Sequence, residues 1–166
     1  MTMTERRTGF TSPASQCRGF ADSTPDRVAL RVKSRGVWEE ISWGQYWDQV
    51  ELFGHALLAS GIEKGDRVAV HSENRPEWLY ADLGGLSIGT AIMGLYPTNP
   101  TAEVEYLLRD SASRVLLVED EEQADKVLAI ASANLPDLER IIYLEHRGVD
   151  AYNDPRLESW DSFMER

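Results

Sequence analysis

Four short apolar segments recur at nearly even spacing from residue 66 onward, and this spacing limits the fold more than any other feature. They are centred near Val68, Ile92, Leu116 and Ile142, which lie 24, 24 and 26 residues apart. Each interval has room for one helix and its connections, as in β-α units joined by crossovers into a mainly parallel sheet. The sequence therefore predicts an α/β fold in which helices flank about four parallel strands.

A β-hairpin and a helix are predicted before the repeated units. Residues 28–33 alternate apolar and polar side chains, residues 34–36 supply a turn, and residues 37–41 are expected to form the returning strand. Ser42 and Gln45 have the spacing of a capping box, so a helix is expected to begin at Ser42. Its apolar stripe is interpreted as core rather than as a surface that stacks a ligand. The stripe consists of Trp43, Tyr46, Trp47, Val50, Phe53, Leu57 and Leu58.

Three more helices are predicted, one in each interval between the apolar segments. The first begins at Pro76 and stops at Gly89, the second begins around residues 99–101, and the third begins at Asp120. Residues 157–166 are expected to form one or two helical turns, with no further strand. Because a sheet that halts there looks unfinished, the chain is expected to continue in a larger protein.

Charge and cysteine content narrow the classes of function. The 166 residues carry a formal charge of −11, which repels nucleic acids and anionic lipids, so no nucleic-acid partner is expected. Cys17 is the only cysteine, which excludes an internal disulfide and fits a reducing cytoplasm. Neither a signal peptide nor a membrane span is evident. A cytoplasmic location is expected, while peripheral membrane contact through a surface patch stays open.

The two ends of the chain differ in composition. Residues 1–20 are polar and aperiodic, and they are predicted to form a flexible N-terminal arm. Residues 21–166 carry all of the predicted strands and helices, and they are expected to form one α/β subdomain.

The stretch RVLLVEDEEQADKVLAIA at residues 114–131 joins an apolar strand to an acidic turn, as at the start of a response-regulator receiver domain. A receiver also needs an Asp, a hydroxyl and a Lys at later strand ends to hold magnesium and the phosphoryl group. The 53 residues from Arg114 onward leave room for only two β-α units. We therefore interpret the acids from Glu119 to Glu122 as stabilising a helix N-terminus, with Asp120 as its cap, in preference to a metal site.

Other catalytic patterns are absent from the sequence. Residues 84–89 are rich in glycine but lack the G-x-G-x-x-G spacing, so they indicate close packing rather than dinucleotide binding. Neither a phosphate-binding G-x-x-x-x-G-K-[ST] loop nor a G-x-S-x-G elbow occurs. His55, His71 and His146 are too scattered to indicate a metal site. His71 ends a predicted strand, at the sheet edge where ligands usually bind, so a binding role for His71 stays open beside a structural one.

Several blocks, taken in order, resemble the amino-terminal part of AMP-forming acyl-CoA synthetases, which are adenylate-forming enzymes. They are ISWGQY at residues 41–46, GIEKGDRVAV at 61–70, NRPEW at 74–78 and LSIGTAIMGLYPTNP at 86–100. Residues 103–108 and the acidic turn within residues 114–127 are most similar to the long-chain fatty acyl branch. The resemblance covers residues 20–166 and depends on the order and spacing of the blocks.

The resemblance implies an enzyme that joins a fatty acid to ATP as an acyl-adenylate and then passes the acyl group to coenzyme A, with Mg²⁺ assisting. Its chemistry depends on a Ser/Thr/Gly-rich phosphate loop with a Lys, a Thr-Glu pair, a ribose-binding Asp and a Lys on a carboxyl-terminal domain. None of these matches a position here, so no catalytic, cofactor-binding or metal-binding residue is assigned. Residues 21–166 would be an incomplete part of the large domain that ends before the phosphate loop, and no cofactor is expected on this chain alone.

Two principal hypotheses follow from these observations. The first is a fragment of a long-chain fatty acid-CoA ligase, inactive alone, whose partner is the missing carboxyl-terminal portion. The second is a naturally truncated relative that acts as an interaction module, pairing through its arm and an exposed sheet edge. A receiver is a third and weaker alternative. Because an incomplete sheet exposes apolar surface, a homodimer is also open.

Overall fold

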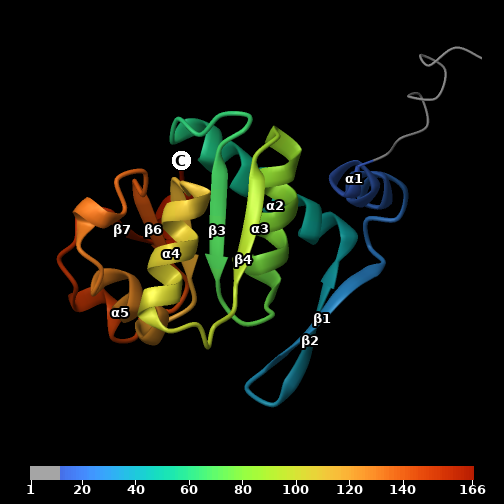
Figure 1. Ribbon diagram of the computed structural model, residues 1–166. Coiled ribbons are helices and arrows are strands. Elements are labelled where there is room, and N and C mark those ends of the chain that lie inside the picture. The colour runs from blue at the N-terminus through green and yellow to red at the C-terminus, as the bar shows by residue number, and fades with distance from the viewer. Residues whose placement is uncertain (1–11) are drawn as a thin grey trace, which may run out of the picture.

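Residues 12–166 are described by the computed structural model, and they form an α/β arrangement with a hairpin beside it (Figure 1). The strands are β1 (Val28–Ser34), β2 (Val37–Ser42), β3 (Arg67–His71), β4 (Ala91–Leu95), β5 (Val115–Val118), β6 (Arg140–Tyr143) and β7 (Leu157–Ser159). The α-helices are α1 (Pro13–Ser23), α2 (Trp43–Ala59), α3 (Pro76–Ile88), α4 (Thr101–Ser111), α5 (Glu121–Leu128) and α6 (Trp160–Met164). Short 3₁₀ turns occupy Ser132–Asn134 and Val149–Ala151.

The main sheet is parallel and has the strand order β4-β3-β5-β6-β7. The four predicted strands are confirmed as β3, β4, β5 and β6. The chain leaves β3 toward β4 on one side and then returns to β5 on the other side. This reversal makes the carboxyl ends of β3 and β5 a topological switch point, which is where open α/β sheets usually bind ligands.

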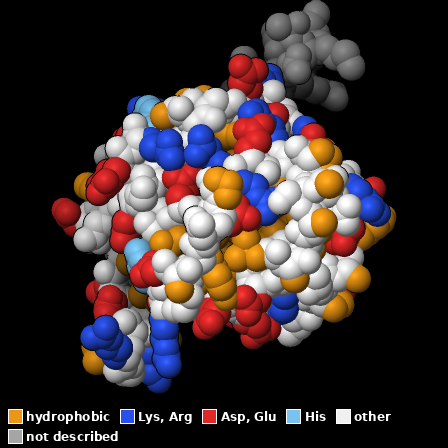
Figure 2. Space-filling view, turned by 90° about the vertical axis from the view of Figure 1, so that its left-hand side faces the viewer, with side chains coloured by type: hydrophobic (Ala, Val, Ile, Leu, Met, Phe, Trp, Pro, Cys, Tyr) orange, Lys and Arg blue, Asp and Glu red, His pale blue; other side chains and the backbone are white. Residues whose placement is uncertain are grey.

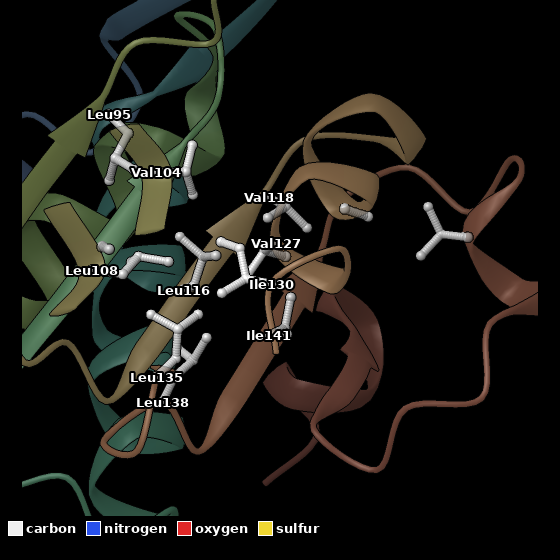
Figure 3. Close-up of a cluster of buried hydrophobic side chains, with 13 residues drawn as sticks. Leu95, Val104, Leu108, Leu116, Val118, Val127, Ile130, Leu135, Leu138 and Ile141 are labelled. Carbon is white, nitrogen blue, oxygen red and sulfur yellow. The ribbon is translucent and has the colours of Figure 1, made fainter. Parts of the chain in front are cut away.

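Two hydrophobic cores lie on opposite faces of the sheet, and the central strands contribute to both. Figure 3 shows the core beneath α4 and α5, where Leu116 and Val118 meet Val104, Leu108 and Val127. On the other face, Val115 and Leu117 of β5 join a core formed by α2, α3 and α6.

Local signals explain the helix boundaries. The capping box predicted at Ser42 is confirmed, because its hydroxyl accepts from the Gln45 backbone N–H at 3.3 Å while the Gln45 side chain accepts from the Ser42 N–H at 2.9 Å. Helix α3 begins at Pro76, and Gly89 ends it in the left-handed conformation at φ 86°. The hairpin is confirmed as an antiparallel pair of β1 and β2.

The glycine-rich stretch packs closely, as predicted. A Cβ built on Gly84 would lie 2.7 Å from the Val50 carbonyl oxygen, and one built on Gly54 would lie 3.2 Å from the Gly84 carbonyl oxygen. Helices α2 and α3 therefore touch backbone to backbone at this point.

Two expectations about the ends of the chain were wrong. Residues 13–20 of the predicted arm belong to helix α1, which Ser12 caps by accepting from the Ser15 N–H at 3.1 Å. Residues 1–11 of the arm lie outside the described residues. A fifth parallel strand, β7, forms within residues 157–166, where only helical turns were expected. Within residues 12–166, no helix combines the length and the apolar character that crossing a membrane requires.

Candidate functional site

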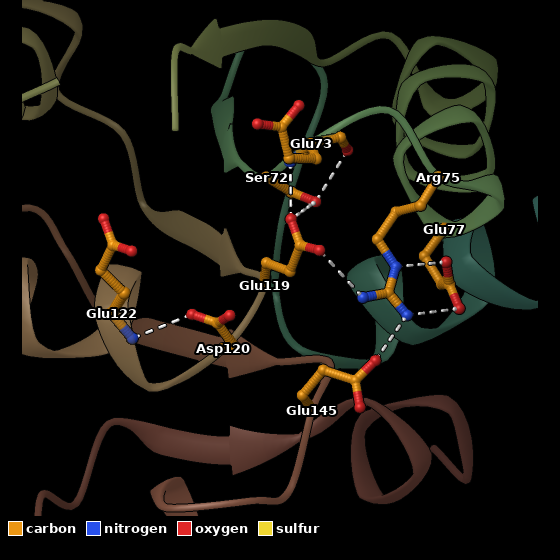
Figure 4. Close-up of polar contacts among 8 residues, drawn as sticks. All are labelled: Ser72, Glu73, Arg75, Glu77, Glu119, Asp120, Glu122 and Glu145. Carbon is orange, nitrogen blue, oxygen red and sulfur yellow. Dashed lines mark hydrogen bonds and ion pairs between the residues drawn. The ribbon is translucent and has the colours of Figure 1, made fainter. Parts of the chain in front are cut away.

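The candidate functional site is the switch point at the carboxyl ends of β3 and β5, because open α/β sheets usually bind ligands there. Ser72 and Glu73 follow β3, Glu119 and Asp120 follow β5, and Glu145 lies beyond β6. Because parallel strands end at one edge, the topology brings these polar residues together (Figure 4).

Glu119 links the loops that follow β3 and β5. The Glu73 backbone N–H donates to Glu119 Oε2 at 2.7 Å, and Ser72 Oγ lies 3.2 Å from the same oxygen. The other carboxylate oxygen, Oε1, lies 3.5 Å from the Arg75 guanidinium. Glu119 is thus held by three groups and is part of an internal network.

Arg75 is the centre of this network. Its guanidinium contacts Glu77 at 2.8 Å and Glu145 at 3.1 Å in addition to Glu119, and about a fifth of its side chain is exposed. Burial disfavours the charge, but the carboxylates of Glu77 and Glu145 outweigh it and raise the pKa of Arg75. One cation therefore joins acids that follow β5 and β6 to the start of α3.

The remaining acids of the turn stabilise helix α5, as predicted. Asp120 is the N-cap and accepts from the Glu122 backbone N–H at 2.9 Å. Glu122 pairs with Lys126 one turn later at 2.8 Å, and this pair lowers the pKa of Glu122. Lys126 also donates to the Pro97 carbonyl at 2.7 Å, which fastens α5 to the loop after β4.

His71 lies at the end of β3 but is completely buried. Burial lowers the pKa of His71, the charge of Lys126 lowers it further, and the backbone oxygens of Tyr96 and Pro97 act in the opposite sense. Among the described residues, neither ring nitrogen has a hydrogen-bond partner of good geometry. The structure therefore favours the structural role of His71, because a ligand has no access to the ring.

The other two histidines lie on different elements. His55 is on α2, and His146 follows β6, where its Nδ1 is 3.0 Å from Asp150. Asp150 also accepts from the Tyr143 hydroxyl at 2.9 Å, and these contacts lower the pKa of Asp150. Across residues 12–166, no group of three or more His, Cys, Asp or Glu side chains is arranged to hold a metal ion.

A pocket of about 290 Å³ adjoins the network on the hairpin side. Leu30 and Val32 of β1 face Pro76, Trp78 and Leu79 of α3 across it, and Arg75 lies between this pocket and the carboxylates. The walls are thus mainly apolar, and Arg75 at one edge is paired with carboxylates of the same chain.

Sequence reasoning identified Asp120 but missed Arg75 and Glu145. Their role depends on the meeting of three strand ends, which periodicity along the chain does not show. One signal was available for Arg75: it directly precedes a Pro-initiated helix after a buried strand, at the edge where parallel sheets place functional loops.

Known proteins with similar sequences include several ligases. A profile of the family described as AMP-binding enzyme matches residues 17–162. The chain is 34% identical over 131 residues to long-chain-fatty-acid--CoA ligase heimdall of Drosophila melanogaster, covering 78% of this chain and 19% of the relative. It is 30% identical over 137 residues to human long-chain-fatty-acid--CoA ligase ACSBG2, covering 82% of this chain and 20% of the relative. The chain thus spans about a fifth of the length of these curated relatives.

Solved structures share the fold. An anthranilate CoA ligase crystallised with anthranoyl-AMP superposes with a TM-score of 0.75 at 24% identity, covering 86% of this chain and 27% of that chain. Coronafacic acid ligase from Pectobacterium brasiliense superposes with a TM-score of 0.79 at 19% identity, covering 94% and 30%. The described sheet and its helices therefore share the fold of part of each of these two solved structures.

Proposed function

Because the chain belongs to the AMP-binding enzyme family, we propose that it supplies the amino-terminal scaffold of a long-chain fatty acyl-CoA ligase. The complete enzyme activates a fatty acid with ATP to an acyl-adenylate, releases pyrophosphate and transfers the acyl group to coenzyme A. Mg²⁺ offsets the phosphate charge during the first step. The substrate class is supported by the names of the curated relatives.

The observation that most supports a scaffold role is the network centred on Arg75. Glu119, Asp120 and Glu122 each have a partner within the chain, which supports a structural role for these acids. Arg75 holds the loops after β3, β5 and β6 in fixed positions at one edge of the sheet. A fixed edge of this kind gives the residues of a neighbouring catalytic segment a rigid support.

Fatty-acid-dependent exchange of pyrophosphate into ATP tests the division of labour. The 166-residue chain, given ATP, Mg²⁺ and fatty acids of several lengths, is expected to show no exchange above the blank. A complete long-chain fatty acyl-CoA ligase in the same buffer is the positive control. Exchange by the chain alone would show that it contains its own catalytic groups and would overturn the scaffold proposal.

The codons that follow Arg166 test the parent enzyme separately. They are expected to encode a Ser/Thr/Gly-rich loop containing a Lys, followed by the remainder of a ligase. A stop codon directly after Arg166 would contradict the fragment interpretation and favour a truncated relative with a different role.

A further inference from the structure

The imidazole of His71 is a buried titratable group that the Arg75 network does not use. It lies at the end of β3, where strand pairing sets Leu95 of β4 on one side and Val118 of β5 on the other. Its exposed fraction is 0%, and within residues 12–166 neither ring nitrogen has a hydrogen-bond partner of good geometry. A buried polar group without a partner costs free energy, and a charge on the same group costs far more. The folded structure therefore favours the neutral ring.

The loop after β4, residues 96–100, lies beside this ring together with helix α5. Ala69 joins the core beneath α4 and α5, and side chains two residues apart on a strand share a face, so His71 is directed to the same side. Lys126 of α5 donates to the Pro97 carbonyl at 2.7 Å, and both Lys126 and Pro97 act on the imidazole. One hydrogen bond thus ties the helix to the loop beside the buried ring.

The charged groups that act on the ring come from α5. Lys126 opposes a positive charge on His71, whereas Glu122, which is exposed and pairs with Lys126 at 2.8 Å, favours one. The buried residues of α4 are apolar, and the Glu119 carboxylate after β5 is held by the backbone N–H of Glu73 in the loop after β3. The loop carbonyls also favour the charge, but burial and Lys126 outweigh them and lower the pKa of His71.

We propose that His71, Lys126 and residues 96–100 form an acid-sensitive latch, which is closed while the imidazole is neutral and opens when the imidazole takes up a proton. A proton on the closed ring would set a second cation beside Lys126 in a buried position. The loop must therefore move away from α5 so that water can reach the charged ring. This opening loosens the carboxyl edge of the sheet without breaking the Arg75 network, and it does not depend on ligase activity.

Acid favours the open state because the exposed ring binds a proton more strongly than the buried ring does. An imidazole in water has a pKa of about 6.5, and the pKa of His71 in the closed state lies below this value. The stabilisation is therefore fully present above about pH 6.5 and is lost as pH falls from there through the closed-state pKa. For one proton, the equilibrium constant for opening rises by up to about tenfold between pH 7.5 and pH 5.5.

Urea unfolding at these two pH values compares the wild-type chain with His71→Leu. Leucine has a similar size and binds no proton, and it replaces two unpartnered nitrogens, so the variant is expected to fold. Figure 2 shows Asp and Glu side chains at several places on one face of the molecule, and their titration affects both chains and cancels in the comparison. The unfolding constant of wild type relative to His71→Leu is expected to rise by up to about tenfold at the lower pH. For the matched control, His55→Leu at an exposed position of α2, this ratio is expected to stay constant.

Hydrogen exchange measured by NMR shows where the structure opens. The Asn99 N–H donates to the Tyr96 carbonyl at 2.9 Å within the loop, and Asn99 is 5% exposed. Asn99 is expected to exchange faster than the Phe53 amide of α2, because the loop opens without global unfolding. At equal pH the intrinsic exchange rate cancels, so the protection of Asn99 in wild type relative to His71→Leu is expected to fall by up to about tenfold between pH 7.5 and pH 5.5.

Lys126→Met is a second test that leaves the imidazole in place. Without the neighbouring ammonium group the closed ring accepts a proton more readily, so the loss of stability between the two pH values is expected to be smaller than in wild type. Lys33→Met removes the same charge from an exposed position of the hairpin and is expected to keep the loss of wild type. The proposal is overturned if wild type and His71→Leu lose stability equally in acid, if Lys126→Met keeps the full loss, or if Asn99 exchanges as slowly as Phe53.

Discussion

Replacing Gly84 by alanine tests the close contact between α2 and α3. The added methyl group would lie 2.7 Å from the Val50 carbonyl oxygen and 3.1 Å from the Phe53 ring. The first neighbour is backbone, so no rotation of a side chain relieves the overlap, and the two helices must separate. Phe53 and Val50 are both fully buried, so the separation also loosens packed side chains.

Two opposing effects set the size of the change. Alanine is better than glycine inside a helix by about 1 kcal/mol, whereas overpacking a tight core costs about 1 to 3 kcal/mol and often more at rigid contacts. Because the closest atom belongs to the backbone, we expect overpacking to win. The net loss is about 1 to 2 kcal/mol in the free energy of unfolding, or roughly 3 to 6 °C in the melting temperature of a chain this long.

The matched control is Gly19→Ala on α1, where an added Cβ would meet no atom within 4 Å. This variant keeps the helix gain without the overlap, so it is expected to be neutral or to stabilise by up to about 1 kcal/mol. Urea unfolding followed by circular dichroism measures both variants. If Gly84→Ala were as stable as wild type, or if both variants lost equal stability, the inferred backbone contact would be refuted.

Three further predictions concern polar groups, and all are measured by urea unfolding. Arg75→Met leaves three carboxylates without their shared cation and should lower the free energy of unfolding by about 2 to 3 kcal/mol. This loss is smaller than for a fully buried pair because a fifth of the Arg75 side chain is exposed. The control, Arg31→Met, breaks a well-exposed pair with Glu40 and should lower the free energy of unfolding by less than about 1 kcal/mol. Equal losses would contradict the central role of Arg75. Ser42→Ala removes half of a capping box and should cost about 1 kcal/mol at any pH between 6 and 8; no loss would show that the cap is not formed. The backbone N–H of Glu63, aided by a nearby guanidinium, lowers the pKa of Asp66 in the folded chain. The stabilisation by Asp66 is therefore present above the unfolded pKa of about 3.9 and is lost as pH falls through the lower folded pKa. Asp66→Asn should thus lower the free energy of unfolding fully at pH 7 and no longer lower it in acid. A loss of stability that is the same at every pH would contradict this linkage.

The parts of the fold that the sequence predicts are those specified by neighbouring residues. The strands have continuous apolar segments because parallel strands are buried on both faces, and all four residues of β5 are indeed buried. The capping box at Ser42 and the αL glycine at position 89 act within one helical turn, so they can be read directly from the chain.

The missed elements lack those signals. Helix α1 buries the small residues Ala14, Cys17 and Ala21, whose spacing is helical but whose side chains give little hydrophobic contrast. Strand β7 has three residues, which is too short for an alternating pattern, and its pairing depends on β6.

In the candidate site, too, the contacts between neighbouring residues could be predicted from the sequence and the contacts between distant residues could not. Asp120 caps the helix that it precedes, so its role is local and was predicted. Glu119 stands one residue earlier, but its partners are Ser72, Glu73 and Arg75, more than forty residues back in the chain. Only the strand order brings these residues together, and the strand order is not encoded in the spacing of the segments.

The shared strands of the two cores have a consequence for how the protein unfolds. Val115 and Leu117 point into one core, and Leu116 and Val118 point into the other. If β5 is displaced when one core is exposed to water, its side chains leave the other core as well. An intermediate that melts only α4 and α5, or only α2 and α3, would lose much of its remaining packing as well. We therefore expect calorimetry to record a single cooperative transition for the whole sheet, with no separate melting of its two sides.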